Sequence, residues 1–220
     1  LSAFGRREAD VLLGTQMVAK GLDFPLVTLV GVIAADTSLH LPDFRAAERT
    51  FQLITQVAGR AGRHELPGQV VVQTYAPDHY AIRAAQRHDY IGFVREELRA
   101  RRILHYPPYC RLALATLSHA ELPKLAEAAG AFAAALRRAA AEAGLLAPLA
   151  GDSGTALELV GPAASPIPRL KDRYRWQVMI KYRGNVDAAG LIRRASESLA
   201  SSRVTGDIQI SVDVDPQMIL

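Results

Sequence analysis

Two arginines in a glycine-rich segment are the residues of this sequence whose spacing best suits catalysis. Arg60 and Arg63 lie three positions apart in the segment QVAGRAGR (Gln56–Arg63), where the neighbouring glycines keep the backbone uncrowded. Two planar guanidinium groups so placed can bind one triphosphate and offset the charge that develops during γ-phosphoryl transfer. The alternative is a glycine-rich turn with solvated arginines, and this segment taken alone favours the turn.

A second segment, GTQMVAKGLDFP (Gly14–Pro25), has the glycines and polar residues of a ligand-binding loop. It follows a short apolar run, Val11–Leu13, which is a candidate for a buried strand. In the other segment, Arg60 and Arg63 lie beyond a helical stretch. We therefore expect both segments in loops at the edge of a parallel sheet, where α/β folds bind their ligands.

The positive charge of the second half is concentrated in RLKDRYRWQVMIKYR (Arg169–Arg183), with six basic residues, one acid and three aromatics. Basic side chains between aromatic rings suit single-stranded nucleic acid, through phosphate neutralisation and base stacking. In a strand, however, Trp176 shares its face with Val178 and Ile180, which predicts that the ring packs into the core. The better DNA-binding candidates are the cations that precede or begin this strand, in a loop with Pro166 and Pro168: Arg169, Lys171, Arg173 and Arg175. An ordinary solvated face is the alternative.

The first half must position its two segments on an α/β fold. The apolar run Val27–Asp36 predicts a strand covered on both faces, followed by a helix from about Phe44 to Ala58 and a strand over Gly68–Tyr75. Strand, helix and strand at this spacing predict parallel βαβ units. The visible strands are too few for a doubly wound sheet, so we expect further strands before residue 1.

The second half has a different order of elements. Helical residues 78–104 lead to HYPPY (His105–Tyr109), where consecutive prolines end the helix. We place the domain boundary there, which gives domains 1–104 and 105–220. Beyond it we expect alternating elements: strand Arg111–Ser118, helix Pro123–Ala143, strands Ala156–Val160 and Arg175–Tyr182, helix Val186–Ala200 and strand Asp207–Val214. This β-α-β-β-α-β order predicts a ferredoxin-like domain with an antiparallel sheet.

Composition limits the possible classes. Half of the 220 residues are hydrophobic and 22% are charged, which is typical of a globular protein and excludes disorder of the whole chain. The longest apolar stretch, Phe24–Ala35, is too short for a membrane helix, so no membrane partner is expected. The single cysteine, Cys110, excludes an internal disulfide framework and fits a reducing cytoplasm. The histidines show no metal-ligand spacing, and the carboxylates of DVDP (Asp213–Pro216) suit a solvated strand end better than a Mg²⁺ site.

The pairing of the two segments resembles motifs V and VI of superfamily 2 helicases, and among these the family of primosomal replication-restart helicases. DFRAAER (Asp43–Arg49), PIPRLKDRYRWQ and the closing DVDP are similar to that family too, so the resemblance covers nearly the whole chain. It implies part of a RecA-like motor lobe with a parallel sheet, followed by a C-terminal DNA-binding domain similar to a small ribosomal-subunit protein.

The resemblance also implies roles for individual residues. Arg63 is the expected arginine finger and Arg60 its partner. Gly21, Asp23 and Gln56 are expected to approach the nucleotide. Thr15 and Gln16 resemble the motif V residues that face the DNA backbone.

Several parts of such a motor are absent from this sequence. It has no G-K-[ST] phosphate loop, no Asp-Glu pair for Mg²⁺ and no zinc-binding cysteines. By family order these parts belong upstream, so ATP and Mg²⁺ would bind with upstream regions, where zinc is also expected, and this fragment should be inactive alone.

The implied function is an ATP-dependent DNA helicase of the bacterial cytoplasm and nucleoid that recognises stalled forks and starts primosome reassembly. Its implied partners are forked and single-stranded DNA, primosome proteins and single-strand-binding proteins. The alternative is a fork-binding scaffold that has lost its motor. A free-standing ribosomal-type RNA-binding protein would leave residues 14–63 unexplained.

Overall fold

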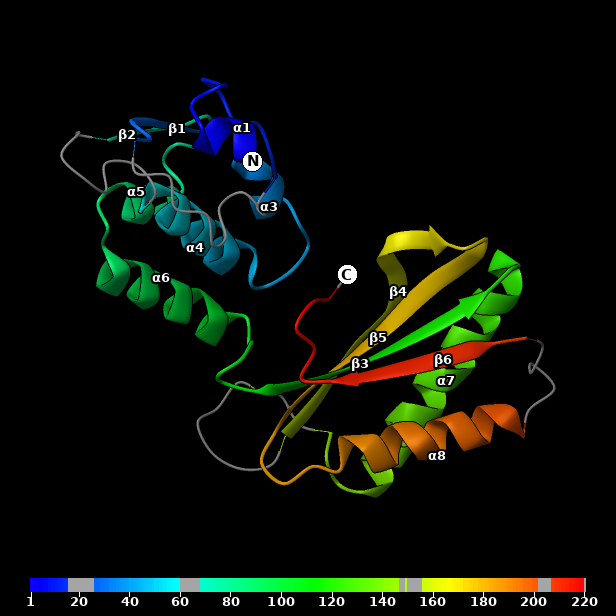
Figure 1. The fold of residues 1–220 in the computed structure, drawn as a ribbon. Coiled ribbons are helices and arrows are strands. Elements are labelled where there is room, and N and C mark those ends of the chain that lie inside the picture. Colours follow the sequence, from blue (N-terminus) through cyan, green and yellow to red (C-terminus); the bar gives the residue numbers. More distant parts are fainter. Residues whose placement is uncertain (16–25, 60–67, 147–148, 150–155, 202–206, 220) are drawn as a thin grey trace. The chain divides into compact units, whose positions relative to one another are not determined.

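The computed structural model describes residues 1–15, 26–59, 68–146, 149, 156–201 and 207–219 (Figure 1). It has the mixed α/β architecture that the sequence predicts, with a parallel two-stranded sheet and an antiparallel four-stranded sheet. The chain divides into two compact units. The first, the N-terminal unit, comprises Leu1–Leu41 and Arg45–Arg99. The second, the C-terminal unit, comprises Pro42–Phe44 and Ala100–Leu220.

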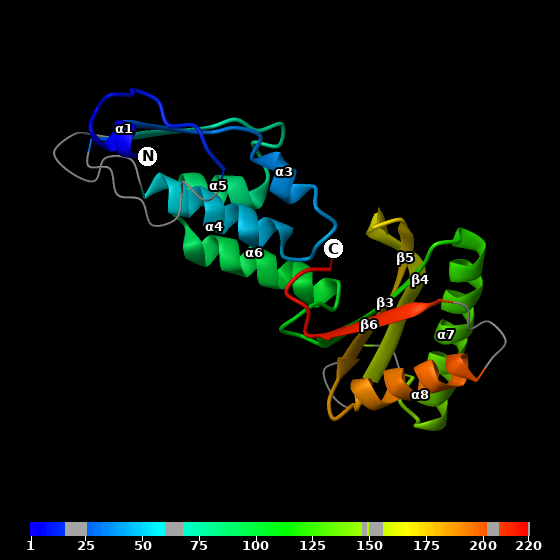
Figure 2. The same cartoon turned by 45° about the vertical axis from the view of Figure 1, so that its right-hand side comes forward.

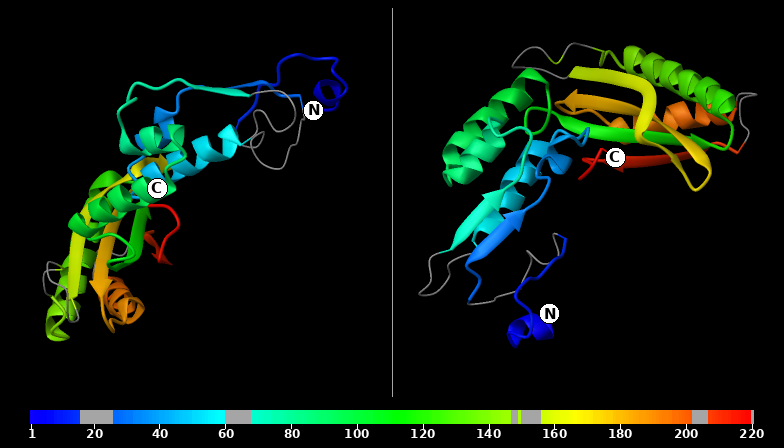
Figure 3. Two further views of the ribbon diagram at one scale, coloured as in Figure 1. Left: turned by 90° about the vertical axis from the view of Figure 1, so that its left-hand side faces the viewer. Right: turned by 90° about the horizontal axis from the view of Figure 1, so that it is seen from above.

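The two strands of the N-terminal unit are shorter than the sequence predicts. β1 (Leu29–Val32) pairs in parallel with β2 (Gln69–Val72), and the two lie side by side in Figure 3. The expected strand over Val27–Asp36 ends early because Ala34 turns into the left-handed region, with φ of 53°, and α3 (Asp36–Leu39) begins two residues later. The predicted strand at Val11–Leu13 is not formed, and these residues have no regular secondary structure.

Helices supply the core of the N-terminal unit. Besides the short α1 (Ser2–Gly5) and α3, they are α4 (Ala46–Ala58), α5 (Tyr80–Gln86) and α6 (Tyr90–Ile103). Phe51 of α4 stacks on Phe93 of α6, with ring centroids 4.2 Å apart and planes 7° from parallel. Ile54 is buried in the same cluster. Packing of its apolar face on this cluster therefore positions α4, and with it the helix end that carries Gln56.

The C-terminal unit has the predicted βαββαβ order. Its elements are β3 (Arg111–His119), α7 (Leu122–Glu142), β4 (Ala156–Leu170), β5 (Arg173–Arg183), α8 (Ala188–Ala200) and β6 (Gln209–Val214). The strands are arranged β4-β5-β3-β6, and every neighbouring pair is antiparallel. This is the ferredoxin-like arrangement, in which each helix connects two parallel strands across one antiparallel neighbour. Helices α7 and α8 cover one face of the sheet (Figures 1 and 2).

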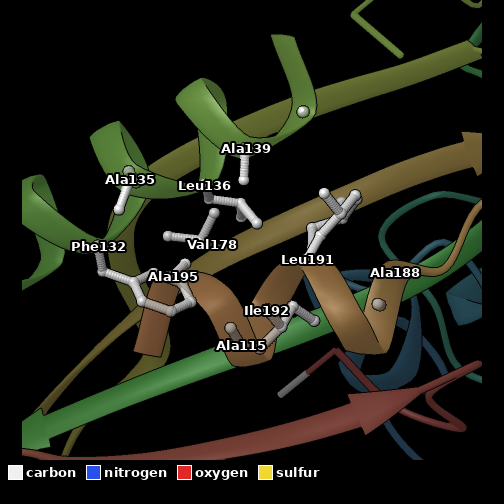
Figure 4. Close-up of a cluster of buried hydrophobic side chains, with 14 of the residues drawn as sticks. Ala115, Phe132, Ala135, Leu136, Ala139, Val178, Ala188, Leu191, Ile192 and Ala195 are labelled. Atoms are coloured by element: carbon white, nitrogen blue, oxygen red, sulfur yellow. The ribbon is translucent and has the colours of Figure 1, made fainter. Parts of the chain in front are cut away.

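The core between helices and sheet follows the alternation of the strands. Val178, Ile180 and Tyr182 of β5 are buried there, and Trp176 is partly buried against the same cluster, as predicted. Helix α7 contributes Leu125, Ala129, Phe132 and Leu136 at helical spacing, all fully buried. Figure 4 shows side chains of α7 and α8 gathered with Ala115 and Val178 of the sheet in one cluster. Because much of this face is alanine, the helix can lie close to the sheet.

Strand β4 departs most from the sequence prediction. It runs to Leu170, through Pro166 and Pro168, instead of ending at Val160 before a loop. Prolines are tolerated because β4 is an edge strand, whose outer side pairs among the described residues only through a bridge between Leu157 and Leu146, away from the prolines. The pairing with β5 shifts register at Gly161, where φ is +100° and an added Cβ would lie 2.7 Å from the Gln177 carbonyl oxygen. β4 and β5 thus form one long hairpin.

The division between the units falls inside α6, between Arg99 and Ala100. The predicted boundary at His105–Tyr109 lies a few residues further along, within the C-terminal unit. Residues 42–44 belong to that unit by contact although they precede α4 in the chain.

Candidate nucleic-acid interface

Two of the predicted DNA-binding cations, Arg169 and Lys171, lie at or next to the turn of the β4–β5 hairpin. Lys171 and Asp172 form the turn, both with positive φ and both exposed. Arg169 pairs with the Asp172 carboxylate at 3.1 Å, and its guanidinium lies over the Tyr174 ring, 5.3 Å from the centroid. An ion pair this exposed contributes little to stability, so Arg169 can exchange these contacts for a phosphate.

Arg173 is held far more firmly than its neighbours. Its side chain is only 19% exposed and forms an ion pair with Asp207. It also donates to the Ser118 hydroxyl at 3.2 Å and to the Ser118 carbonyl at 3.0 Å. The guanidinium lowers the pKa of Asp207. This geometry makes Arg173 a connection between β3, β5 and the residues before β6.

The sheet face that α7 and α8 leave uncovered is polar at the hairpin end. Register brings six side chains together there, which we call the polar sheet face: Thr116, Ser118, Arg175, Gln177, Gln209 and Ser211. Arg175 is half-buried, and the Gln177 amide nitrogen is buried without a hydrogen-bond partner among the described residues. Arg175 and Gln177 donate hydrogen bonds, which suits phosphate and base edges.

The register separates the four predicted cations. Arg169 is paired with Tyr174, on the side of the sheet that carries the helices, whereas Arg175 is paired with Ser118 on the polar sheet face. Lys171 lies at the turn between them. The four cations therefore do not make one flat patch: the turn and the polar sheet face are two neighbouring places where DNA could bind.

Residues 102–217 match the family model of the primosomal protein N C-terminal domain. The chain belongs to this family. It is 49% identical over 220 residues to the replication restart protein PriA of Bacillus subtilis, 41% over 219 residues to that of Synechocystis, and 38% over 221 residues to that of Treponema pallidum. Each alignment covers 100% of this chain but only 26%, 24% and 31% of those proteins. The chain thus spans about a quarter of the length of these curated relatives.

Of the residues predicted for the nucleotide and the motif V contacts, only Thr15 and Gln56 can be placed. Thr15 is exposed in a bend, and Gln56 is exposed in the last turn of α4. The other predicted residues lie outside the described part of the chain: Gln16, Gly21, Asp23, Arg60 and Arg63. Their roles stay predictions.

Asp36 is a buried residue at the carboxyl ends of β1 and β2 to which the sequence pattern assigned no role. It accepts hydrogen bonds from the Thr74 hydroxyl at 2.6 Å and from the Tyr75 amide at 2.8 Å. The Thr74 hydroxyl, followed by the backbone donors, lowers the pKa of Asp36. The sequence signal for this role was the position of Asp36 at the end of the apolar run Val27–Asp36. Asp36 fixes the loop after β2 to the loop after β1, at the edge where ligands bind in α/β folds.

Lys181 belongs to the basic segment Arg169–Arg183 but is buried. It is only 8% exposed, donates to the Leu104 carbonyl at 2.8 Å and lies over the Tyr106 ring, 3.9 Å from its centroid. Burial lowers the pKa of the Lys181 ammonium. Arg183 donates to the Leu149 carbonyl at 3.4 Å. Lys181 and Arg183 therefore make contacts within the C-terminal unit at the end of β5 that lies away from the hairpin turn.

Membrane spans and metal sites are two further classes of feature that the described residues lack. No helix there is long and apolar enough to cross a membrane. No three His, Cys, Asp or Glu side chains in the described ranges are grouped so as to hold a metal ion. Asp215, one of the DVDP carboxylates, instead pairs with Arg111 at 2.6 Å.

Proposed function

We propose that this chain is the C-terminal part of an ATP-dependent DNA helicase that recognises stalled or abandoned replication forks and starts primosome reassembly. Family membership over residues 102–217 carries the proposal. Relatives named replication restart protein PriA align with the whole chain, including both motif-like segments.

The motor role is assigned to the segments of the first half. Arg63 would stabilise the charge that develops on the transferred γ-phosphoryl group, with Arg60 beside it. Gln56, Gly21 and Asp23 would approach the nucleotide. Support for this arrangement comes from α4, a helix with a buried apolar face whose last turn leads directly into the arginine segment.

DNA binding is assigned to the C-terminal unit and to Thr15 and Gln16 of motif V. Arg169 and Lys171 would neutralise phosphates at the hairpin turn, and Arg175 would do so on the polar sheet face. Arg173 would act indirectly, since its contacts with Ser118 and Asp207 hold the strands that carry its neighbours.

ATP is the proposed substrate, and Mg²⁺ the ion that would accompany it. By the resemblance to the helicase family, Mg²⁺ and zinc are both assigned to upstream parts of the parent. The proposed partners are forked and single-stranded DNA, primosome proteins and single-strand-binding proteins, in the bacterial cytoplasm and its nucleoid.

ATP hydrolysis by the full-length parent tests the proposal, measured with and without a forked DNA. Hydrolysis that rises on addition of the fork supports a motor. Tight fork binding without hydrolysis would contradict the motor and favour the scaffold alternative.

A further inference from the structure

The short segment Pro42–Phe44 belongs to one unit by contact and leads directly into an element of the other. It follows α3 in the chain and packs within the C-terminal unit. Two residues after Phe44, helix α4 begins at Ala46 in the N-terminal unit. The segment overlaps DFRAAER, one of the family-like stretches, yet neither the proposed motor residues nor the proposed DNA-binding residues include it.

The contacts of Asp43 tie this segment to the last residues of the chain. Asp43 is only 8% exposed, and its Oδ2 accepts a hydrogen bond from the Ile219 backbone amide at 3.2 Å. Ile219 is itself 5% exposed, in a cluster with Cys110 and Leu112 on the sheet face opposite α7 and α8. Burying a carboxylate costs free energy unless donors bind it, so the hydrogen bond from the Ile219 amide helps to position the segment.

The contacts of Phe44 add a second attachment. Its ring is stacked on Tyr106, with centroids 5.0 Å apart and planes 4° from parallel. Arg101 lies over the Phe44 ring at 5.0 Å, and Lys181 lies over Tyr106 at 3.9 Å. Cation–aromatic contacts are strongest when desolvated, and Lys181 is buried. The stack therefore connects Phe44 to strand β5, which also carries Arg175 of the polar sheet face.

Helix α4 can transmit a displacement at its first turn to its last. Its 13 residues run without interruption from Ala46 to Ala58, a length of about 20 Å at 1.5 Å per residue. The last turn holds Gln56, and Arg60 follows two residues after the helix ends.

We propose that Asp43 and Phe44 are positioning residues that couple DNA binding by the C-terminal unit to ATP hydrolysis through α4. The inference rests on the proposed motor function and adds the path by which DNA regulates it. A coupling between two ligands changes the affinity for each by about 5- to 150-fold, and this reciprocity applies to the binding of nucleotide and DNA, not to the rate of hydrolysis. Nucleotide should therefore change DNA affinity through the same segment.

The test uses two variants of Ile219 in the full-length parent. Ile219→Pro removes the amide that donates to Asp43, whereas Ile219→Val keeps the amide and an apolar side chain. ATP hydrolysis is measured with and without forked DNA, and fork affinity with and without a non-hydrolysable ATP analogue. We expect the nucleotide to change fork affinity by about fivefold or more in the wild type and Ile219→Pro to lose this change. The same variant should lose the DNA stimulation of hydrolysis, with unchanged basal hydrolysis. Ile219→Val should behave as wild type.

A second pair of variants, at Phe44, keeps the test decisive if the Ile219→Pro protein does not fold. Phe44→Leu removes the stack on Tyr106, and Phe44→Tyr retains it. Full stimulation in both Ile219→Pro and Phe44→Leu overturns the coupling and leaves the proposed motor intact. An equal loss of basal and stimulated hydrolysis also overturns it, because that pattern reports a merely structural role. A wild-type protein that hydrolyses no ATP overturns the motor and the coupling together, whereas hydrolysis that DNA does not stimulate overturns the coupling alone.

Discussion

The two units differ in how completely they bury their apolar residues. In the C-terminal unit, both helices and the sheet close over a cluster whose largest members, Tyr182 and Phe132, are almost fully buried. In the N-terminal unit, the strands are four residues long and leave Leu29 59% and Val71 51% exposed. Each unit nevertheless has its own buried cluster. Stability should therefore reside mainly in the C-terminal unit, and the proposed chemistry in the less covered one.

The largest effect should come from a variant that loses ATP hydrolysis but keeps DNA binding, because we assign these two properties mainly to different units. In the full-length parent, Arg63→Ala should lower ATP hydrolysis by about 10³- to 10⁵-fold, because the finger offsets charge only in the transition state. DNA affinity should stay close to wild type, since the proposed binding cations lie in the other unit. Steady-state hydrolysis and fluorescence anisotropy measure the two. Arg87→Ala, an exposed arginine after α5, is the matched control. Near-normal turnover in Arg63→Ala would mean that this guanidinium only decorates a turn.

Truncation of a buried side chain in each unit should show whether the units unfold separately. Phe132→Ala should lower the unfolding free energy of the C-terminal unit by about 3–5 kcal/mol, because a fully buried aromatic leaves a cavity. Trp176, the single tryptophan, reports on this unit by its fluorescence during urea denaturation. Phe51→Ala, in the cluster of the N-terminal unit, should leave the fluorescence transition in place. Equal shifts of that transition by both variants would show that the two clusters unfold as one.

The sequence predicted the C-terminal unit better than the N-terminal one, for a physical reason. Alternation along β5 and helical spacing along α7 both reflect a core that is complete within the chain, so pattern and burial agree. In the N-terminal unit, the apolar run Val27–Asp36 shows which residues avoid water but not where pairing ends. Only four residues of that run find a partner strand in the described chain.

The candidate interface shows the same limit. Basic residues between aromatics indicate a DNA-binding segment at Arg169–Arg183, but charge alone does not show which of its cations are already bound by groups of the same chain. Arg173 and Lys181 are held by Asp207 and by the Leu104 carbonyl, which are distant in sequence. Asp43 and Ile219 are 176 positions apart, and no local pattern connects them.

A smaller effect is expected at the hairpin and the polar sheet face. Replacing Arg169, Lys171 and Arg175 by glutamine should weaken single-stranded DNA binding and flatten the slope of log K against log salt by about 2, at about 0.7 per phosphate contact. Arg173 is left in place because it holds the strands. The control replaces three arginines on the helices: Arg138, Arg193 and Arg194. A salt titration by anisotropy compares the two triple variants. If both slopes fall equally, the hairpin cations are an ordinary solvated face.

The smallest effect should be the pH dependence that Asp36 gives the N-terminal unit. Its pKa is lowered from the usual 3.8, because the Thr74 hydroxyl and the Tyr75 and Ala76 amides favour the carboxylate in the folded chain. A lowered folded pKa adds stability that is complete above the unfolded pKa and is lost as pH falls through the folded pKa. Asp36→Asn should therefore destabilise the N-terminal unit at pH 7 and remove part of its loss of stability below about pH 4. Helix content followed by circular dichroism during denaturation, at pH 7 and pH 3, measures both, and Trp176 fluorescence should not change. If the stability of the wild type and of the Asp36→Asn variant falls in parallel with pH, this carboxylate does not hold the two strand ends together.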